Sequence, residues 1–173
     1  MREIFIVYHG LGMAGKTTNL EFLSSVFQNL KIDRFHQSTV EGRTVYLDML
    51  LMAIKIKGSE EKLKVRLFST PGQERFSVVR SWIFSNADGF VFIVDPTQHI
   101  DENLRSYGEL REYTTKKPVV IQINKTDIVG EVDSLKKIFG NRTVFTASAK
   151  NGVGVRETFL TILKEVIENG VGK

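Results

Sequence analysis

An apolar run at residues 4–9 ends in Gly10-Leu11-Gly12-Met13-Ala14-Gly15-Lys16-Thr17, and a helical pattern follows at once. This stretch fits the pattern G-x-x-x-x-G-K-[ST] in the strand–loop–helix setting that the pattern requires. Its glycines let the backbone curl so that N–H groups converge on phosphate oxygens, and the start of the helix adds a positive dipole end. The stretch therefore predicts a phosphate-binding loop, with Thr18 beside it, rather than a glycine turn that carries a lysine by chance.

Two side chains of this loop have separate predicted tasks. The Lys16 ammonium can reach the β- and γ-phosphates of a nucleotide, and the Thr17 hydroxyl can ligate Mg²⁺. The loop alone does not indicate which base the nucleotide carries. That choice depends on residues further along the chain.

Two later strand ends predict the base, and they read Asn124-Lys125-Thr126-Asp127 and Ser148-Ala149-Lys150. The Asp127 carboxylate can accept two hydrogen bonds from N1–H and N2–H₂ of guanine. Adenine has no donor at either place, and a site built on such bonds discriminates on the order of 10⁴-fold. The Lys125 stem can lie against the base plane, Asn124 can brace the loops, and the Ala149 N–H can meet guanine O6. Because ligands of such sheets bind at the carboxyl ends of the strands, the two loops together predict guanine.

Apolar runs rich in Ile, Val and Phe alternate with amphipathic stretches, which indicates a parallel sheet covered by helices. Six strands are predicted, at residues 4–9, 50–57, 63–68, 89–95, 119–124 and 143–146. Five helices are predicted, at residues 16–30, 74–85, 101–115, 132–139 and 153–169. The expected fold is one α/β domain over residues 1–173, of the three-layer P-loop NTPase kind. Its sheet is expected to be six-stranded and mostly parallel, with one antiparallel edge hairpin.

The predicted strands 50–57 and 63–68 leave no room for a helix between them, so they are expected to form the hairpin. Alternation places an apolar set on the buried side, namely Ile54, Ile56, Leu63, Val65 and Leu67. It places a basic set on the other side, namely Lys55, Lys57, Lys62, Lys64 and Arg66. We interpret the basic set as a solvated sheet face. The alternative is a docking surface for an acidic partner or a membrane.

The sequence supports predictions for three other features of the chain. Residues 31–48 show no clear periodicity, and a long segment of that kind is usually functional or mobile. Trp82 and its neighbours Ile83 and Phe84 are predicted to lie in the core, and the alternative is a binding site for a partner. The three histidines are scattered along the chain and do not suggest a metal cluster; they are His9, His36 and His99.

The segment Ser69-Thr70-Pro71-Gly72-Gln73-Glu74-Arg75-Phe76 follows the third predicted strand. With the loops above, it makes the chain resemble the Ras superfamily of small GTPases over nearly its whole length. The resemblance implies that the Gly72 N–H senses the γ-phosphate. It also implies that Gln73 orients the attacking water, which needs an amide able to donate and accept at once. Thr44 would close onto Mg²⁺ and the γ-phosphate, so Thr17 and Thr44 are the expected metal ligands.

Ser69 departs from the superfamily pattern, which has an aspartate there to hold Mg²⁺ through a water. A hydroxyl can still bridge to that water but brings no charge, so metal affinity is expected to be weaker. Asp48 is a candidate to compensate for the missing carboxylate.

Serine or threonine at this place, followed one residue on by Pro-Gly-Gln, is similar to the MglA group of prokaryotic small GTPases. Two further features are similar to that group: residues 15–20, and Arg43-Thr44 with Asp48 four residues on. The resemblance implies that Arg43 is an intrinsic arginine finger, a cation set against charge that builds up in the transition state. The alternative is that Arg43 is a solvated loop charge, and Arg75 and Arg80 are less favoured candidates for the same task.

Composition and net charge argue against several other classes of function. The chain has 173 residues, a net charge of +4, 25% charged residues and no cysteine. This mild charge does not argue for nucleic acid, and the lack of cysteine excludes thiolate metal sites, prenylation and palmitoylation. Because the sequence shows no signal-peptide pattern, we expect a cytoplasmic protein. We also expect a monomer and no intrinsic membrane anchor.

The expected function is a switch that binds GTP or GDP with Mg²⁺ and slowly hydrolyses GTP to GDP and phosphate, with Gln73 and Arg43 as catalytic residues. The MglA resemblance implies acceleration by a GTPase-activating partner, a homodimeric roadblock-fold (MglB-like) protein, and a role in cell polarity or motility. Nothing in the sequence names a downstream effector. The alternative is a GTP-binding scaffold that does not hydrolyse, which Ser69 motivates. A P-loop nucleotide kinase is disfavoured, because the assigned elements leave little room for a lid and a second substrate pocket.

Overall fold

The computed structural model describes residues 3–27, 32–38, 44–55, 58, 62–71 and 77–170. Within these residues, seven strands form one sheet in the order β2-β3-β4-β1-β5-β6-β7. The strands are β1 (Glu3–Gly10), β2 (Ile32–Ser38), β3 (Thr44–Lys55), β4 (Lys62–Ser69), β5 (Gly89–Val94), β6 (Val119–Ile123) and β7 (Thr143–Thr146). The helices are α1 (Lys16–Val26), α2 (Ser77–Asn86), α3 (Ile100–Arg111), α4 (Asp133–Ile138) and α5 (Val155–Gly170). None of these five helices is long and apolar enough to cross a membrane.

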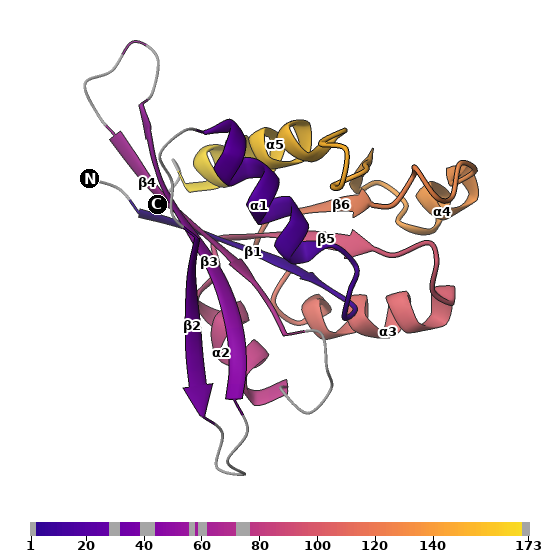
Figure 1. Ribbon diagram of the computed structural model, residues 1–173, viewed down its shortest axis with the longest axis horizontal. Coiled ribbons are helices and arrows are strands. Elements are labelled where there is room, and N and C mark those ends of the chain that lie inside the picture. The colour runs from indigo at the N-terminus through magenta and orange to yellow at the C-terminus, as the bar shows by residue number, and fades with distance from the viewer. Residues whose placement is uncertain are drawn as a thin grey trace.

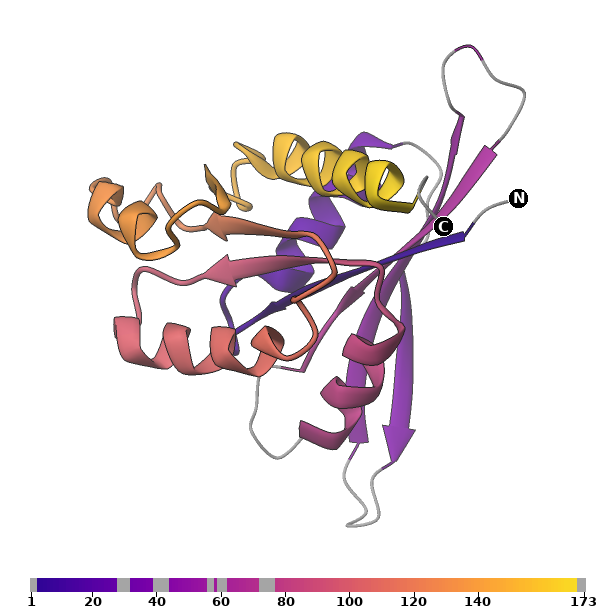
Figure 2. The same ribbon diagram turned by 180° about the vertical axis from the view of Figure 1, so that it is seen from behind.

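Helices cover both faces of the sheet (Figure 1). Helices α1 and α5 lie on one face, and α2 and α3 lie on the other, as the view from behind also shows (Figure 2). The first face buries Leu20 and Leu23 of α1 with Phe159 of α5. The second face buries Phe84 of α2 and Leu110 of α3. Strands β5 and β6 are buried along their whole length, which is typical of parallel strands covered on both sides.

This architecture confirms the predicted three-layer α/β fold, and all six predicted strands and five predicted helices are present. Strands β4, β1, β5, β6 and β7 run parallel, and β3 pairs antiparallel with β4. The predicted alternation of the hairpin holds, with Leu63, Val65 and Leu67 buried and Lys55 and Lys62 exposed. Ile56 and Lys57 lie outside the described residues.

The sheet has one strand more than the sequence pattern predicts. Strand β2 falls inside residues 31–48, for which no regular structure is predicted, and it pairs antiparallel with β3. Strand β3 itself begins at Thr44 rather than at residue 50. The β3–β4 hairpin is therefore not the edge of the sheet, because β2 takes that place. Backbone hydrogen bonds between β2 and β3 form this ladder, and they need no apolar alternation in the sequence.

Trp82 also differs from its prediction as a core residue. Its side chain is 65% exposed, whereas Ile83 and Phe84 are buried. Successive residues of a helix point about 100° apart, so α2 can turn Ile83 and Phe84 toward the sheet and leave Trp82 outside. Val78 lies one turn earlier on the same outer face and is 82% exposed.

Phe159 provides a test of the core between the sheet and α5. Its ring is fully buried and packs edge-to-face against Phe27, with ring centroids 5.7 Å apart. We expect Phe159→Ala to lower the free energy of unfolding by about 3–5 kcal/mol, because the truncation leaves a cavity. Leu160→Ala, at an exposed position of the same helix, should cost about 1 kcal/mol or less. Urea titrations followed by circular dichroism compare the two variants, and equal losses would contradict this packing.

Candidate functional site

The loop after β1 approaches the neighbouring strands so closely that two of its glycines are required. A Cβ atom at Gly10 would clash with the carbonyl oxygen of Ile93 at the end of β5. A Cβ atom at Gly15 would clash with the side-chain amide of Asn124, just beyond β6. Gly15 also has a φ of 103°, which residues with side chains rarely adopt. The loop therefore lies at the edge of the sheet where β1, β5 and β6 all end (Figure 1).

Lys16 spans this loop from its helical end. Its Nζ donates hydrogen bonds to the carbonyl oxygens of Gly10 at 2.8 Å and Leu11 at 2.5 Å, and the side chain is buried. Burial, followed by the positive charge of Arg80, lowers the pKa of Lys16 from 10.5 to about 8. A desolvated ammonium gains from a nearby anion, so this side chain suits the phosphates of a nucleotide.

Three oxygen-bearing side chains meet beside Lys16, from α1, β3 and β4. The Thr17 hydroxyl donates a hydrogen bond to Oδ2 of Asp48 at 2.5 Å. The Ser69 hydroxyl donates to the same oxygen at 3.5 Å. The register of β3 and β4 pairs Asp48 directly with Ser69, and both side chains are buried. The Asp48 carboxylate thus lies next to Ser69, whose hydroxyl carries no negative charge.

These oxygen atoms fit the metal that the family pattern implies. Mg²⁺ prefers oxygen ligands, and proteins usually bind it through one or two carboxylates together with substrate phosphates. The Thr17 hydroxyl and the Asp48 carboxylate supply ligands of that kind next to the phosphate-binding loop. Thr44, the other expected metal ligand, is the first residue of β3 and pairs with Ser38 of β2.

A cavity of about 160 Å³ lies between the phosphate-binding loop and the two loops predicted to bind the base. It is lined by Met13, Gly15, Thr18, Asn124, Lys125, Asp127, Ile128, Ala149 and Lys150. Oδ1 of Asp127 accepts a hydrogen bond from the Ser148 hydroxyl at 2.7 Å, which orients the carboxylate. The Lys125 ammonium donates to Asp95 at 2.5 Å, which holds the Lys125 stem in the wall of the cavity.

Asn124 joins two of these loops through one buried side chain. Its Nδ2 donates to the carbonyl oxygen of Ala14 at 2.9 Å. Its Oδ1 accepts from the backbone N–H of Ala149 at 2.8 Å. The Ala149 N–H, expected to meet guanine O6, is therefore engaged by Asn124 here. The bridge sets the position of the phosphate-binding loop relative to the base pocket.

Two residues that support the site were not predicted from the sequence. Asp95, at the end of β5, is fully buried and accepts hydrogen bonds from Lys125 and from the backbone and hydroxyl of Thr97. Asn19 of α1 is also fully buried; its Nδ2 donates to the carbonyl oxygen of Gly15 and its Oδ1 accepts from Gln122. Two features of the sequence could have identified them. Asp95 is a carboxylate at the end of a predicted strand, and Asn19 is an amide on the apolar face of a predicted helix.

Several predicted functional residues lie outside the described residues, namely Arg43, Gly72, Gln73 and Arg75. Arg80 is described, and it forms a two-point ion pair with Glu109 of α3, with Nε 2.6 Å from Oε2. It also donates to the carbonyl oxygen of Pro71 at 3.2 Å. Arg80 thus connects the end of β4 to α3.

A phosphate-binding loop, an oxygen cluster beside its threonine and a pocket for a base define a nucleotide-binding protein of the P-loop class. The sequence profile of the Ras family matches residues 6–168. The chain belongs to the Ras family and is a GTP-binding small GTPase.

Three relatives illustrate this similarity. The mutual gliding-motility protein MglA of Myxococcus xanthus is 32% identical over 94% of this chain and 89% of its own length. The uncharacterized protein MJ1339 of Methanocaldococcus jannaschii is 31% identical over 76% of this chain and 75% of its own length. The Ras-related protein RABG1 of Arabidopsis thaliana is 28% identical over 96% of this chain and 84% of its own length. The predicted resemblance to the MglA group is confirmed.

The bridge made by Asn124 can be tested by nucleotide affinity. We expect Asn124→Ala to weaken GDP binding about 10- to 100-fold, because two buried backbone groups lose a partner at a cost of about 1–3 kcal/mol. Asn141→Ala, at an exposed asparagine away from these loops, is the matched control. Displacement of a fluorescent GDP analogue measures both affinities. If both variants bind GDP equally well, the bridge does not stabilise the site.

Proposed function

We propose that this small GTPase is a switch between GTP-bound and GDP-bound states that slowly hydrolyses GTP in the presence of Mg²⁺. The observation that carries the proposal is the convergence of three features at one edge of the sheet. They are the Lys16 ammonium, the Thr17–Asp48 hydrogen bond and the pocket lined by Asp127. These features suit, in turn, the phosphates, the metal and the guanine base of Mg²⁺-bound GTP.

The proposed reaction is an in-line attack of water on the γ-phosphate. Gln73 orients the water, while Lys16 and Arg43 offset the negative charge that develops on the phosphate oxygens. The Gly72 N–H and Thr44 contact the γ-phosphate side of the nucleotide, so the segments around them respond to its loss. GTP and GDP thereby favour different conformations of the same surface.

Thr17 and Thr44 are the proposed metal ligands. Asp48 is the proposed source of the negative charge that an aspartate in place of Ser69 would supply. Mg²⁺ held by these residues would supply positive charge against the phosphate oxygens. The Asp48 carboxylate lies across the strand pair from Ser69 and is hydrogen-bonded to Thr17, which supports this role. Weak metal binding was the motive for the alternative of a non-hydrolysing scaffold, so the position of Asp48 favours the hydrolysing switch.

We further propose that a partner accelerates hydrolysis. The resemblance to the MglA group implies a homodimeric roadblock-fold protein that acts on a monomeric switch, with a role in cell polarity or motility. The exposed side chains of Val78 and Trp82 on α2 give such a partner apolar contacts close in sequence to Gln73.

Phosphate release tests the catalytic assignment. GTP-loaded protein with Mg²⁺ should release γ-phosphate at about 10⁻⁴ s⁻¹, the scale of an unassisted small GTPase. Gln73→Ala and Arg43→Ala should slow the partner-stimulated reaction by about 10³-fold or more, since both act on the transition state. Arg142→Ala, at an exposed arginine far in sequence from Arg43 and Gln73, is the control.

Two outcomes would contradict the proposal. If the protein binds ATP as well as GTP, the guanine assignment is wrong. If GTP-loaded protein releases no phosphate with or without an activating partner, the non-hydrolysing scaffold is the better hypothesis.

If Asp48 supplies the negative charge of the metal site, a carboxylate at position 69 on the neighbouring strand should replace it. Asp48→Asn keeps the shape of the side chain but removes its charge, so we expect the Mg²⁺ concentration that half-maximally slows GDP release to rise about 10-fold or more. The double variant Asp48→Asn/Ser69→Asp returns a carboxylate from the neighbouring strand and should recover most of that loss. Stopped-flow release of a fluorescent GDP analogue over a Mg²⁺ series measures both effects. An unchanged Mg²⁺ dependence in Asp48→Asn would remove Asp48 from the metal site.

A further inference from the structure

His9 is a buried imidazole that the proposed mechanism does not use. It is the residue of β1 directly before the phosphate-binding loop, and it is 1% exposed. Its ring packs edge-to-face against Phe84 of α2, with centroids 4.9 Å apart, and lies 6.0 Å from the ring of Phe92. Burial, followed by the charge of Lys16, lowers the pKa of His9 from 6.5 to about 3. The imidazole is therefore neutral at physiological pH.

The hydrogen bonds of this neutral ring assign its tautomer. Nε2 lies 3.1 Å from both the carbonyl oxygen and the hydroxyl oxygen of Ser106 on α3. The hydroxyl can donate or accept, but the carbonyl can only accept. Nε2 therefore carries the hydrogen, and Nδ1 carries the lone pair. Nδ1 lies 2.8 Å from Oγ1 of Thr70. The Thr70 hydroxyl is therefore the donor of that bond, which is shorter than its 3.4 Å contact with the carbonyl oxygen of Tyr8. His9 thus connects α3 to Thr70 through two directed hydrogen bonds.

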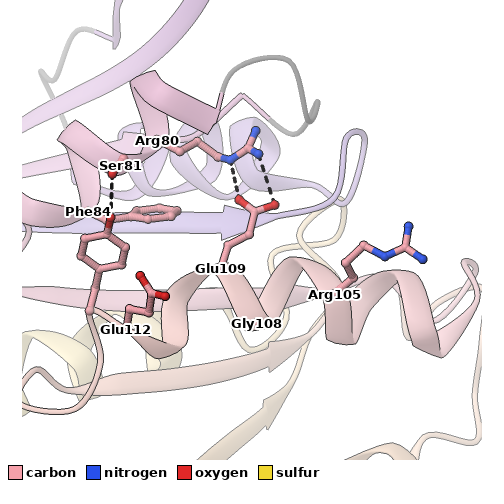
Figure 3. Close-up of a pocket in the computed structure, with 8 residues that line it drawn as sticks. Arg80, Ser81, Phe84, Arg105, Gly108, Glu109 and Glu112 are labelled. Carbon is pink, nitrogen blue, oxygen red and sulfur yellow. Dashed lines mark hydrogen bonds and ion pairs between the residues drawn. The ribbon is translucent and has the colours of Figure 1, made fainter.

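Thr70 is the residue at which the chain leaves β4 toward Gln73. Its backbone N–H also donates to the carbonyl oxygen of Tyr8 at 3.0 Å, so Thr70 is attached to β1 at two points. The next residue, Pro71, accepts a hydrogen bond from Arg80. Arg80 is in turn held by Glu109 through the ion pair drawn in Figure 3. His9 and Arg80 therefore anchor consecutive residues, Thr70 and Pro71, to the same helix.

Both anchors end on one face of α3. Ser106 and Glu109 are three residues apart, which places them on adjacent turns of the helix. Oε2 of Glu109 also lies 4.0 Å from Nε2 of His9. Thr70 and Pro71, the two residues before the segment 72–76, are therefore both connected to α3.

We infer that His9 is a positioning residue for GTP hydrolysis, which acts by fixing the Thr70 hydroxyl and so the place from which the chain reaches Gln73. This inference rests on the proposed function. Gln73 is three residues beyond Thr70 in the sequence. A displacement of about 1 Å at a catalytic group can cost about 10²-fold in rate. Loss of the hydrogen bond between His9 and Thr70 therefore slows hydrolysis, but it leaves the base pocket and Lys16 in place.

Two substitutions separate the two hydrogen bonds of His9. His9→Gln can place an N–H donor near the Nε2 position but offers no acceptor to Thr70. His9→Asn can place an amide oxygen near the Nδ1 position but offers no donor to Ser106. We expect His9→Gln to slow single-turnover hydrolysis about 10- to 100-fold, and His9→Asn to be clearly faster than His9→Gln. GDP affinity should change far less than the rate in both variants. His99→Gln, at an exposed histidine, is the matched control.

Thr70 supplies the second arm of the experiment if the His9 variants fold poorly. Thr70→Val removes the hydroxyl at nearly constant shape and should slow hydrolysis as much as His9→Gln, whereas Thr70→Ser should retain more of the rate. The double variant His9→Gln/Thr70→Val should be no slower than the slower single variant, because both remove the same bond. Phosphate release, GDP affinity and thermal midpoint are measured for each variant.

The outcomes distinguish this inference from the proposed function. If the unmodified protein releases no phosphate from GTP with or without an activating partner, the proposed function fails. If it hydrolyses GTP but the two Thr70 variants are equally fast, the inference alone is wrong. Additive losses in the double variant, or losses of rate that only follow losses of GDP affinity and thermal stability, would make His9 an ordinary core residue.

Discussion

The parallel pairing of β1 with both β4 and β5 is the constraint on which the site depends. It brings the ends of three strands to one edge of the sheet, so the phosphate-binding loop, Thr70 and Asp95 start from neighbouring points. Gly10 can then lie directly against the backbone of β5, where no Cβ fits. Asn124, beyond the next strand, is close enough to hydrogen-bond both to this loop and to Ala149. Strand pairing therefore sets the geometry of the nucleotide site before any ligand is present.

The antiparallel pairing of β3 with β4 adds the part of the site that differs from the usual superfamily pattern. Ser69 stands where most of the superfamily has an aspartate, but the β3–β4 register places Asp48 opposite it. The Asp48 carboxylate contacts both Ser69 and Thr17. We propose that this neighbouring strand supplies the charge that Ser69 lacks, because chemistry at a metal depends on where an oxygen lies and not on which strand carries it.

Contiguous motifs made part of the site predictable, and contacts between distant residues made the rest unpredictable. Lys16 and Asp127 belong to short motifs whose neighbours in sequence are also their neighbours in space. His9 had no such signal, because its partners Thr70 and Ser106 are 61 and 97 residues away in the chain. Asp95 stood at a predicted strand end, but its partner Lys125 is 30 residues further along. The importance of such residues appears only when the strands are assembled.

The sequence by itself determined the fold class, the order of most strands and helices, the phosphate-binding loop and the membership of a GTPase superfamily. These properties depend on local periodicity and on motifs of a few residues, which physical chemistry constrains within one segment. Only the tertiary structure decided that β2 forms a seventh strand, that Trp82 lies on the outer face of α2 and that Asp48 meets Thr17. Each of these depends on a pairing or packing partner far away in the chain, and local patterning carries no information about which partner that is.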